Sequence, residues 1–122
     1  MMAKTKESKL EEEVERLMQR KGIWQLARYQ AQSNQNGLPD RLYLYKGYLL
    51  GLELKTDVGE PTDLQLKKIK EINKNGGIAL IVRSTKVIEQ LICIIDLYDR
   101  IVKNCSKQIQ REIKDWMEYN EN

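Results

Sequence analysis

The chain of 122 residues contains no histidine, and this absence narrows the chemistry open to it. Without imidazole there can be no histidine-based metal site, no Ser-His-Asp hydrolysis and no nuclease whose general base is histidine. Acid–base chemistry must therefore fall to carboxylates, lysines or metal-bound water.

Cysteine is almost as scarce. The two cysteines, Cys93 and Cys105, form no CxxC motif, and both fall in segments predicted to be helical. Such isolated thiols are typical of buried or free cysteines, not of a disulfide framework. They fit a protein that works in a reducing compartment.

Long apolar runs are missing as well. No stretch approaches the ~18 consecutive apolar residues of a membrane span, and residues 1–6 lack the apolar core of a signal peptide. The sequence contains no internal repeat and no low-complexity segment. It therefore predicts an intracellular, cytoplasmic protein with no membrane partner.

What remains is the composition of one globular domain spanning residues 1–122, with 41% hydrophobic and 32% charged residues. The net charge is only +3, but it is unevenly distributed. Between residues 62 and 86 only Asp63 and Glu71 oppose six bases: Lys67, Lys68, Lys70, Lys74, Arg83 and Lys86. Such a segment can bind a polyanionic backbone, and it is equally typical of a solvated surface.

Hydrophobic periodicity and turn residues predict one helix, three strands, a helix, a strand and two further helices. The first helix should begin near Ser8, because Ser8 and Glu11 have capping-box spacing, and end at Gly22. Strands are expected at 23–30, 41–45, 48–54 and 78–82, and the later helices at about 62–75, 86–104 and 107–119. This order predicts an α/β fold with a mixed central sheet flanked by helices, in which residues 78–82 form an inner strand.

Two carboxylates and a lysine flank the predicted hairpin. If Lys46-Gly47 is a two-residue turn, Asp40 lies directly opposite Glu53, with Cβ atoms roughly 4.5–5.5 Å apart. Lys55 then falls on the same face of the sheet as Glu53, while the flanking leucines point into the core. A three-residue turn would instead pair Asp40 with Leu54 and remove this geometry.

Two carboxylates that lie so close repel each other unless a cation sits between them. Oxygen ligands of this kind suit Mg²⁺ or Mn²⁺, and the neighbouring lysine could orient an attacking water. This is the outline of a metal-dependent nuclease. The plain alternative is a turn aspartate beside a solvated Glu-Lys ion pair.

Five motifs occur in the order found in the PD-(D/E)XK nuclease superfamily: Gly37-Leu38-Pro39-Asp40-Arg41, Glu53-Leu54-Lys55, Pro61-Thr62-Asp63-Leu64-Gln65, Gly76-Gly77 and Val82-Arg83-Ser84. Within that superfamily the chain resembles the VRR-NUC family (virus-type replication-repair nucleases), in the stand-alone form that phages carry. The resemblance implies a restriction-endonuclease-like αβββαβ core over about residues 8–84, and cytoplasm of the host cell if a phage encodes the protein. No motif covers the helical extension at 86–119.

The resemblance also implies roles for individual residues. Asp40 and Glu53 would bind Mg²⁺ or Mn²⁺ together with the backbone carbonyl of Leu54, and Lys55 would be the catalytic lysine. Gln65 would orient water or substrate near the metal, although it could instead be only the capping-box partner of the preceding threonine.

An acid of the first helix usually completes such a site. Glu11 fits best, although Glu12, Glu13 and Glu15 are adjacent and Glu11 could instead belong to the capping box of Ser8.

The implied substrate is DNA. The favoured function is a structure-specific endonuclease of the Holliday-junction resolvase type. The alternatives are a flap, nicking or restriction-like nuclease and a non-catalytic DNA-binding module. A broad apolar stripe on the C-terminal helices favours a homodimer. Candidate contacts to the DNA backbone, each of which could also be a plain surface residue, are Lys67, Lys68, Lys70, Lys74, Arg28 and Ser33.

Overall fold

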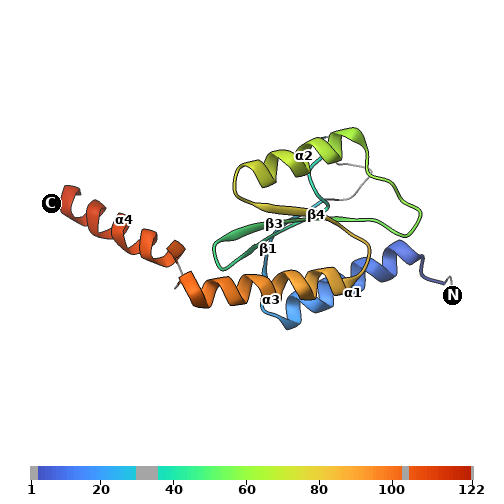
Figure 1. The fold of residues 1–122 in the computed structure, drawn as a ribbon, viewed down its shortest axis with the longest axis horizontal. Coiled ribbons are helices and arrows are strands. Elements are labelled where there is room, and N and C mark those ends of the chain that lie inside the picture. Colours follow the sequence, from blue (N-terminus) through green and yellow to red (C-terminus); the bar gives the residue numbers. More distant parts are fainter. Residues whose placement is uncertain (1–2, 30–35, 103–104, 122) are drawn as a thin grey trace.

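The computed structural model describes residues 3–29, 36–102 and 105–121, which form a mixed four-stranded sheet with four helices. The elements are α1 (Lys6–Arg20), β1 (Trp24–Arg28), β2 (Arg41–Tyr45), β3 (Tyr48–Leu54), α2 (Asp63–Lys74), β4 (Ile78–Val82), α3 (Thr85–Val102) and α4 (Cys105–Glu121). Helix α2 covers one face of the sheet, α1 and α3 cover the other, and α4 projects away from it (Figure 1). The α/β class and the order of the elements are as predicted.

The strands lie in the order β1-β2-β3-β4. Strands β1, β2 and β3 pair antiparallel with one another, and β4 runs parallel to β3 after the crossover through α2. Strand β4 is therefore an edge, and the prediction of an inner strand was wrong. Helices α2 and α3 both contact it from opposite faces, which explains why an edge strand has a continuously apolar sequence.

The turn between β2 and β3 is the two-residue turn predicted. Lys46 has φ 50° and Gly47 has φ 87°, so both central residues are left-handed, as a type I′ hairpin requires. Arg41 pairs with Leu52 and Tyr45 with Tyr48. This register excludes the three-residue turn and brings Asp40, just before β2, to the level of Glu53.

Side chains alternate between the two faces of this hairpin. Tyr43, Leu50, Leu52 and Leu54 enter the hydrophobic core, together with apolar residues of α1 and α3. Gly51 faces α2, where an added Cβ would lie 2.9 Å from the Pro39 side chain. The residues of β3 between the core leucines, Glu53 among them, therefore face α2.

Helix α1 begins earlier than the capping-box pattern predicted. Thr5 is the N-cap, its hydroxyl accepts a hydrogen bond from the Ser8 N–H at 3.0 Å, and Ser8 is already inside the helix. The prediction of a start at Ser8 was wrong because Thr5 supplies the cap one turn before it. As a result, Glu7 lies in the first turn, and Glu11 is not part of a capping box.

Residues 103–104, between α3 and α4 in the sequence, lie outside the described residues. Helix α3 packs its inner side, Ile88, Ile92 and Ile95, into the core. Cys93 is free and exposed. Across the described ranges, no helix has the length and apolar character needed to cross a membrane.

Candidate active site

Asp40 and Glu53 are both removed from solvent, with exposed fractions of 8% and 0%. The Leu54 N–H donates to Asp40 Oδ2 at 3.1 Å, which fixes this carboxyl against the end of β3. The Tyr29 N–H donates to the Asp40 carbonyl at 2.8 Å and holds the backbone. The other carboxyl oxygen, Asp40 Oδ1, is buried and has no hydrogen-bond partner among the described residues.

The Glu53 carboxylate is held by Gln65. The Gln65 side-chain amide donates to Glu53 Oε1 at 3.0 Å and lies 3.4 Å from Oε2. The same side chain forms the capping box of α2, since Thr62 N–H donates to Gln65 Oε1 at 2.9 Å and Gln65 N–H to the Thr62 hydroxyl at 3.1 Å. Gln65 is therefore both the capping-box partner of Thr62 and a contact of Glu53. The cap fixes the orientation of the amide that contacts Glu53.

The environment disfavours negative charge on this pair. Burial first, and the neighbouring charge of Asp40 second, raise the pKa of Glu53 to about 8, against a smaller opposing effect of Lys55. Burial also raises the pKa of Asp40, although the Leu54 N–H and the Lys55 charge oppose the shift. The two carboxyls interact directly, so near neutral pH the pair should hold a shared proton or a cation.

Lys55 follows directly on β3. Its N–H donates to the Val82 carbonyl at 3.0 Å and so extends the pairing of β3 with β4 by one residue. Its positive charge lowers the pKa of both carboxyls. The structure thus brings together Asp40, Glu53, Lys55 and Gln65, which are 25 positions apart at most along the chain.

Glu11 lies elsewhere, beside the buried guanidinium of Arg41. Arg41 is 1% exposed and pairs with Leu52, so its side chain lies on the α1 face of the sheet, opposite to Glu53. Its Nη2 is 3.5 Å from Glu15 Oε1 and 3.9 Å from Glu11 Oε2. Arg28, a candidate DNA contact, joins the same group through Glu15 at 2.8 Å.

The acid of α1 that acts on the carboxylate pair is Glu7, whose charge raises the pKa of Glu53. It lies one turn before Glu11 on the same side of the helix, where α1 passes the end of the sheet. The four-residue spacing from Glu11 was the available signal. This spacing did not identify Glu7, because a helix that starts at Ser8 leaves Glu7 outside the helix.

The basic residues of α2 do not face the carboxylates. At about 100° per residue, Lys67, Lys70 and Lys74 fall on the side of the helix opposite Gln65, and all three are exposed. Lys68 pairs with Glu71 at 3.2 Å. The remaining candidate contact, Ser33, lies outside the described residues.

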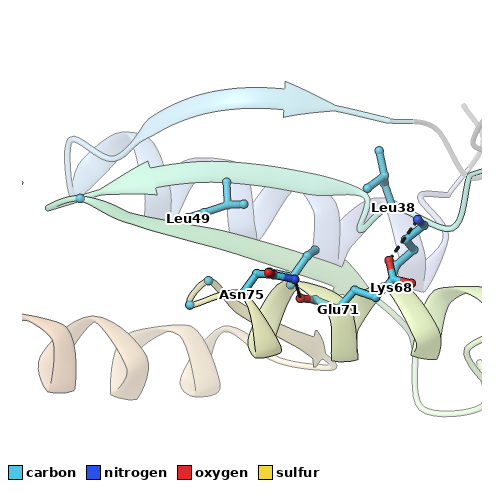
Figure 2. Close-up of a pocket in the computed structure, with 9 residues that line it drawn as sticks. Leu38, Leu49, Lys68, Glu71 and Asn75 are labelled. Atoms are coloured by element: carbon cyan, nitrogen blue, oxygen red, sulfur yellow. Dashed lines mark hydrogen bonds and ion pairs between the residues drawn. The ribbon is translucent and has the colours of Figure 1, made fainter.

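A hollow of about 450 Å³ opens between α2 and the β2–β3 hairpin (Figure 2). Leu38 and Leu49 give it an apolar wall, while Lys68 and Asn75 both bond to Glu71, the latter through its side-chain amide to the backbone carbonyl at 2.8 Å. These polar groups satisfy one another. Neither Asp40 nor Glu53 lines this hollow.

The residues at the carboxylate pair fit a divalent cation. Both acids are buried, one oxygen lacks a partner, and neither forms an ion pair with a cation of the described ranges. The same ranges contain no group of three or more acidic, cysteine or histidine side chains placed to hold a metal. Two carboxylates and the Leu54 carbonyl leave several positions to water and substrate, as Mg²⁺ prefers.

In comparisons with known proteins, no family model, no curated protein and no solved structure matches this chain. Its function has to be inferred from the residues themselves.

Proposed function

We propose that the protein is a metal-dependent endonuclease that hydrolyses DNA phosphodiester bonds at Asp40 and Glu53, on a restriction-endonuclease-like core of the VRR-NUC type. One observation carries the proposal. Two buried carboxyls with raised pKa values are fixed by neutral donors beside a lysine, and neither forms an ion pair with a cation of the described residues. Such a costly arrangement is typical of a functional site.

Each residue has a role that follows from its position. When bound, Mg²⁺ or Mn²⁺ would supply Lewis-acid activation of water and neutralise charge on the phosphate. Asp40 and Glu53, with the Leu54 carbonyl, would be its ligands. Lys55 orients the attacking water and stabilises the negative charge that develops on the phosphate oxygens. Gln65 keeps the Glu53 carboxylate fixed through its amide.

The proposed substrate is branched DNA, with the four-way junction first. Helix α4 carries a stripe of Ile109, Ile113 and Trp116, whose exposed fractions are 55%, 52% and 66%. An amphipathic helix that leaves its apolar side in water is expected to pack on a partner, and a second copy is the simplest one. Two active sites related by a two-fold axis suit symmetric cuts in a four-way junction.

Cleavage assays test the proposal directly. Labelled four-way junction, flap, nicked and plain duplex DNA are incubated with Mg²⁺ or Mn²⁺ and wild type, Lys55→Ala, Asp40→Asn or the control Lys67→Ala. We expect paired junction cuts that fall by about 10³-fold in Lys55→Ala and Asp40→Asn, because several kcal/mol of transition-state stabilisation are lost and 1.36 kcal/mol is tenfold.

The control should cut like wild type. Cleavage of flap, nicked or plain duplex DNA alone, abolished in the same two variants, would keep the site and change the substrate. Salt-sensitive DNA binding without cleavage of any substrate would contradict the enzyme and support a binding module.

The dimer is tested apart from catalysis. Ile113→Asp with Trp116→Asp should convert a dimer into a monomer in light scattering, because charges would enter the buried stripe. Lys114→Asp on the polar side of α4 is the matched control and should leave the mass unchanged. A wild type that is already monomeric at micromolar concentration would contradict the dimer.

A further inference from the structure

A basic hollow of about 290 Å³ lies where β3 and β4 end. Lys6 and Lys9 of α1, Arg83 after β4 and Lys86 of α3 line it. Glu13 and Asp57 are its acidic residues, and Glu60 Oε1 lies 3.9 Å from Arg83 Nη2, so four cations face three acids.

The lysines stand where helix electrostatics disfavours them. Lys6 and Lys9 lie in the first residues of α1, and Lys86 is the second residue of α3. The N-terminal end of a helix carries partial positive charge, so acids stabilise it and cations destabilise it. None of the three lysines forms an ion pair with a carboxylate of the described part of the chain. An anion in the hollow would relieve this repulsion.

The hollow adjoins the segment of the chain that directly follows Lys55 of the proposed active site. Thr56, the residue after Lys55, forms part of its wall. Arg83 donates hydrogen bonds to the carbonyls of Thr56 and Gly59, the latter at 2.8 Å, and so fastens the loop after β3 to the end of β4. Glu7, which raises the pKa of Glu53, lies between the two lysines of α1. One extended ligand can therefore reach both places.

We propose that this hollow binds a backbone phosphate of DNA that neighbours the scissile phosphate. The DNA then crosses the N-terminal ends of α1 and α3, where helix N–H groups add to the lysines. It does not run along the outer face of α2, where Lys67 and Lys70 point away from the carboxylates. This inference rests on the proposed nuclease function and adds the path of the DNA to it.

The test measures binding without cleavage. In a Glu53→Gln background, which removes one metal ligand, the double change Lys9→Gln/Lys86→Gln is compared with Lys67→Gln/Lys70→Gln. Both doubles remove two exposed lysines, so they change the net charge equally. Affinity for a fluorescent four-way junction and for a plain duplex is measured by anisotropy over a range of salt concentrations.

We expect the hollow variant to bind about 10- to 100-fold more weakly and to lower the slope of log affinity against log salt by about two, one for each lost phosphate contact. The α2 variant should match its parent. Equal loss in both doubles, a larger loss in the α2 double, or no DNA binding by the parent would each overturn the proposal.

The two proposals can fail separately. If the hollow variant binds more weakly but wild type cuts no DNA, the binding site stands and the nuclease falls. If wild type cuts DNA and the hollow variant binds like its parent, the nuclease stands and this site falls.

Discussion

Two neighbouring residues, Asp40 and Arg41, carry buried charges to opposite faces of the same sheet, and their surroundings differ. Arg41 meets Glu11 and Glu15 of α1 and donates to the Asp40 carbonyl at 3.2 Å. Asp40 and the adjacent Glu53 meet each other and the neutral donors of Leu54 and Gln65.

The difference separates a structural role from a functional one. A buried cation with acids around it is an ordinary ion-pair network that holds α1 to the sheet. A buried pair of like charges lowers the stability of the fold, and proteins retain such pairs at sites that bind or react. Changing the acids on the two faces should therefore move stability in opposite directions.

The largest effect is expected on the Arg41 face. Changing Glu11→Gln and Glu15→Gln together leaves the guanidinium buried without a counter-charge, which should cost about 3–5 kcal/mol in urea unfolding. Glu12→Gln with Glu13→Gln removes the same charge from the same helix and should change stability far less, because these acids do not contact Arg41. Equal effects of the two doubles would show that Arg41 does not depend on these acids.

On the other face of the sheet, removing an acid should stabilise the fold. Glu53→Gln removes a buried charge yet keeps an oxygen that accepts from Gln65, so at pH 8 without divalent cations it should raise the free energy of unfolding by about 1–3 kcal/mol. The same variant should lose cleavage. If Glu53→Gln is less stable than wild type at pH 8, Glu53 has a structural role like that of Arg41.

A smaller effect is expected from Gly37→Ala, which tests how tightly the loop before Asp40 packs against α2. Gly37 has φ +73°, and an added Cβ would lie 2.6 Å from the Leu64 side chain and 2.8 Å from its carbonyl. Gly76 has φ +92° with nothing within 4 Å, so Gly76→Ala measures the backbone strain alone. We expect Gly37→Ala to cost about 1–3 kcal/mol more than Gly76→Ala in urea unfolding, through overpacking next to Gln65.

If the two variants unfold alike, the loop is not held tightly against α2. If they differ as expected, Gly37→Ala should also slow cleavage, because Leu64 moves together with the residue that fixes Glu53.

Much of this site follows from sequence because its geometry is local. The turn Lys46-Gly47 sets the register of the hairpin, and the register alone brings Asp40 to Glu53. Gln65 was assigned to the site by the family resemblance, and the capping box with Thr62, which the structure contains, was the alternative.

The remaining features depend on tertiary packing. Whether an acid of α1 faces Arg41 or Glu53 depends on where the helix starts and how it crosses the sheet, so the sequence led to Glu11 and its neighbours and did not indicate Glu7. The edge position of β4 could not be predicted from its sequence. Helices that cover both faces of an edge strand favour the same continuously apolar sequence that is typical of an inner strand. The basic hollow joins α1 to α3 across about 80 residues of sequence, and no local pattern shows such a junction.

The most direct test of the central claim is thermal unfolding of wild type between pH 5 and 9, with and without Mg²⁺. The Glu53 carboxyl binds its proton more tightly when folded, with a pKa of about 8 against an ordinary value of 4.5. Its stabilising contribution is therefore present below pH 4.5 and is lost as pH rises through 8, by at most about 1.4 kcal/mol per pH unit for one proton.

Mg²⁺ should restore stability at pH 8, by about 2.7 kcal/mol or roughly 10 °C at a concentration 100 times its Kd, and should have little effect at pH 5. Glu53→Gln should show neither the pH dependence nor the Mg²⁺ effect. If the melting temperature of wild type changes with neither pH nor Mg²⁺, the claim that the carboxylate pair binds a cation is contradicted.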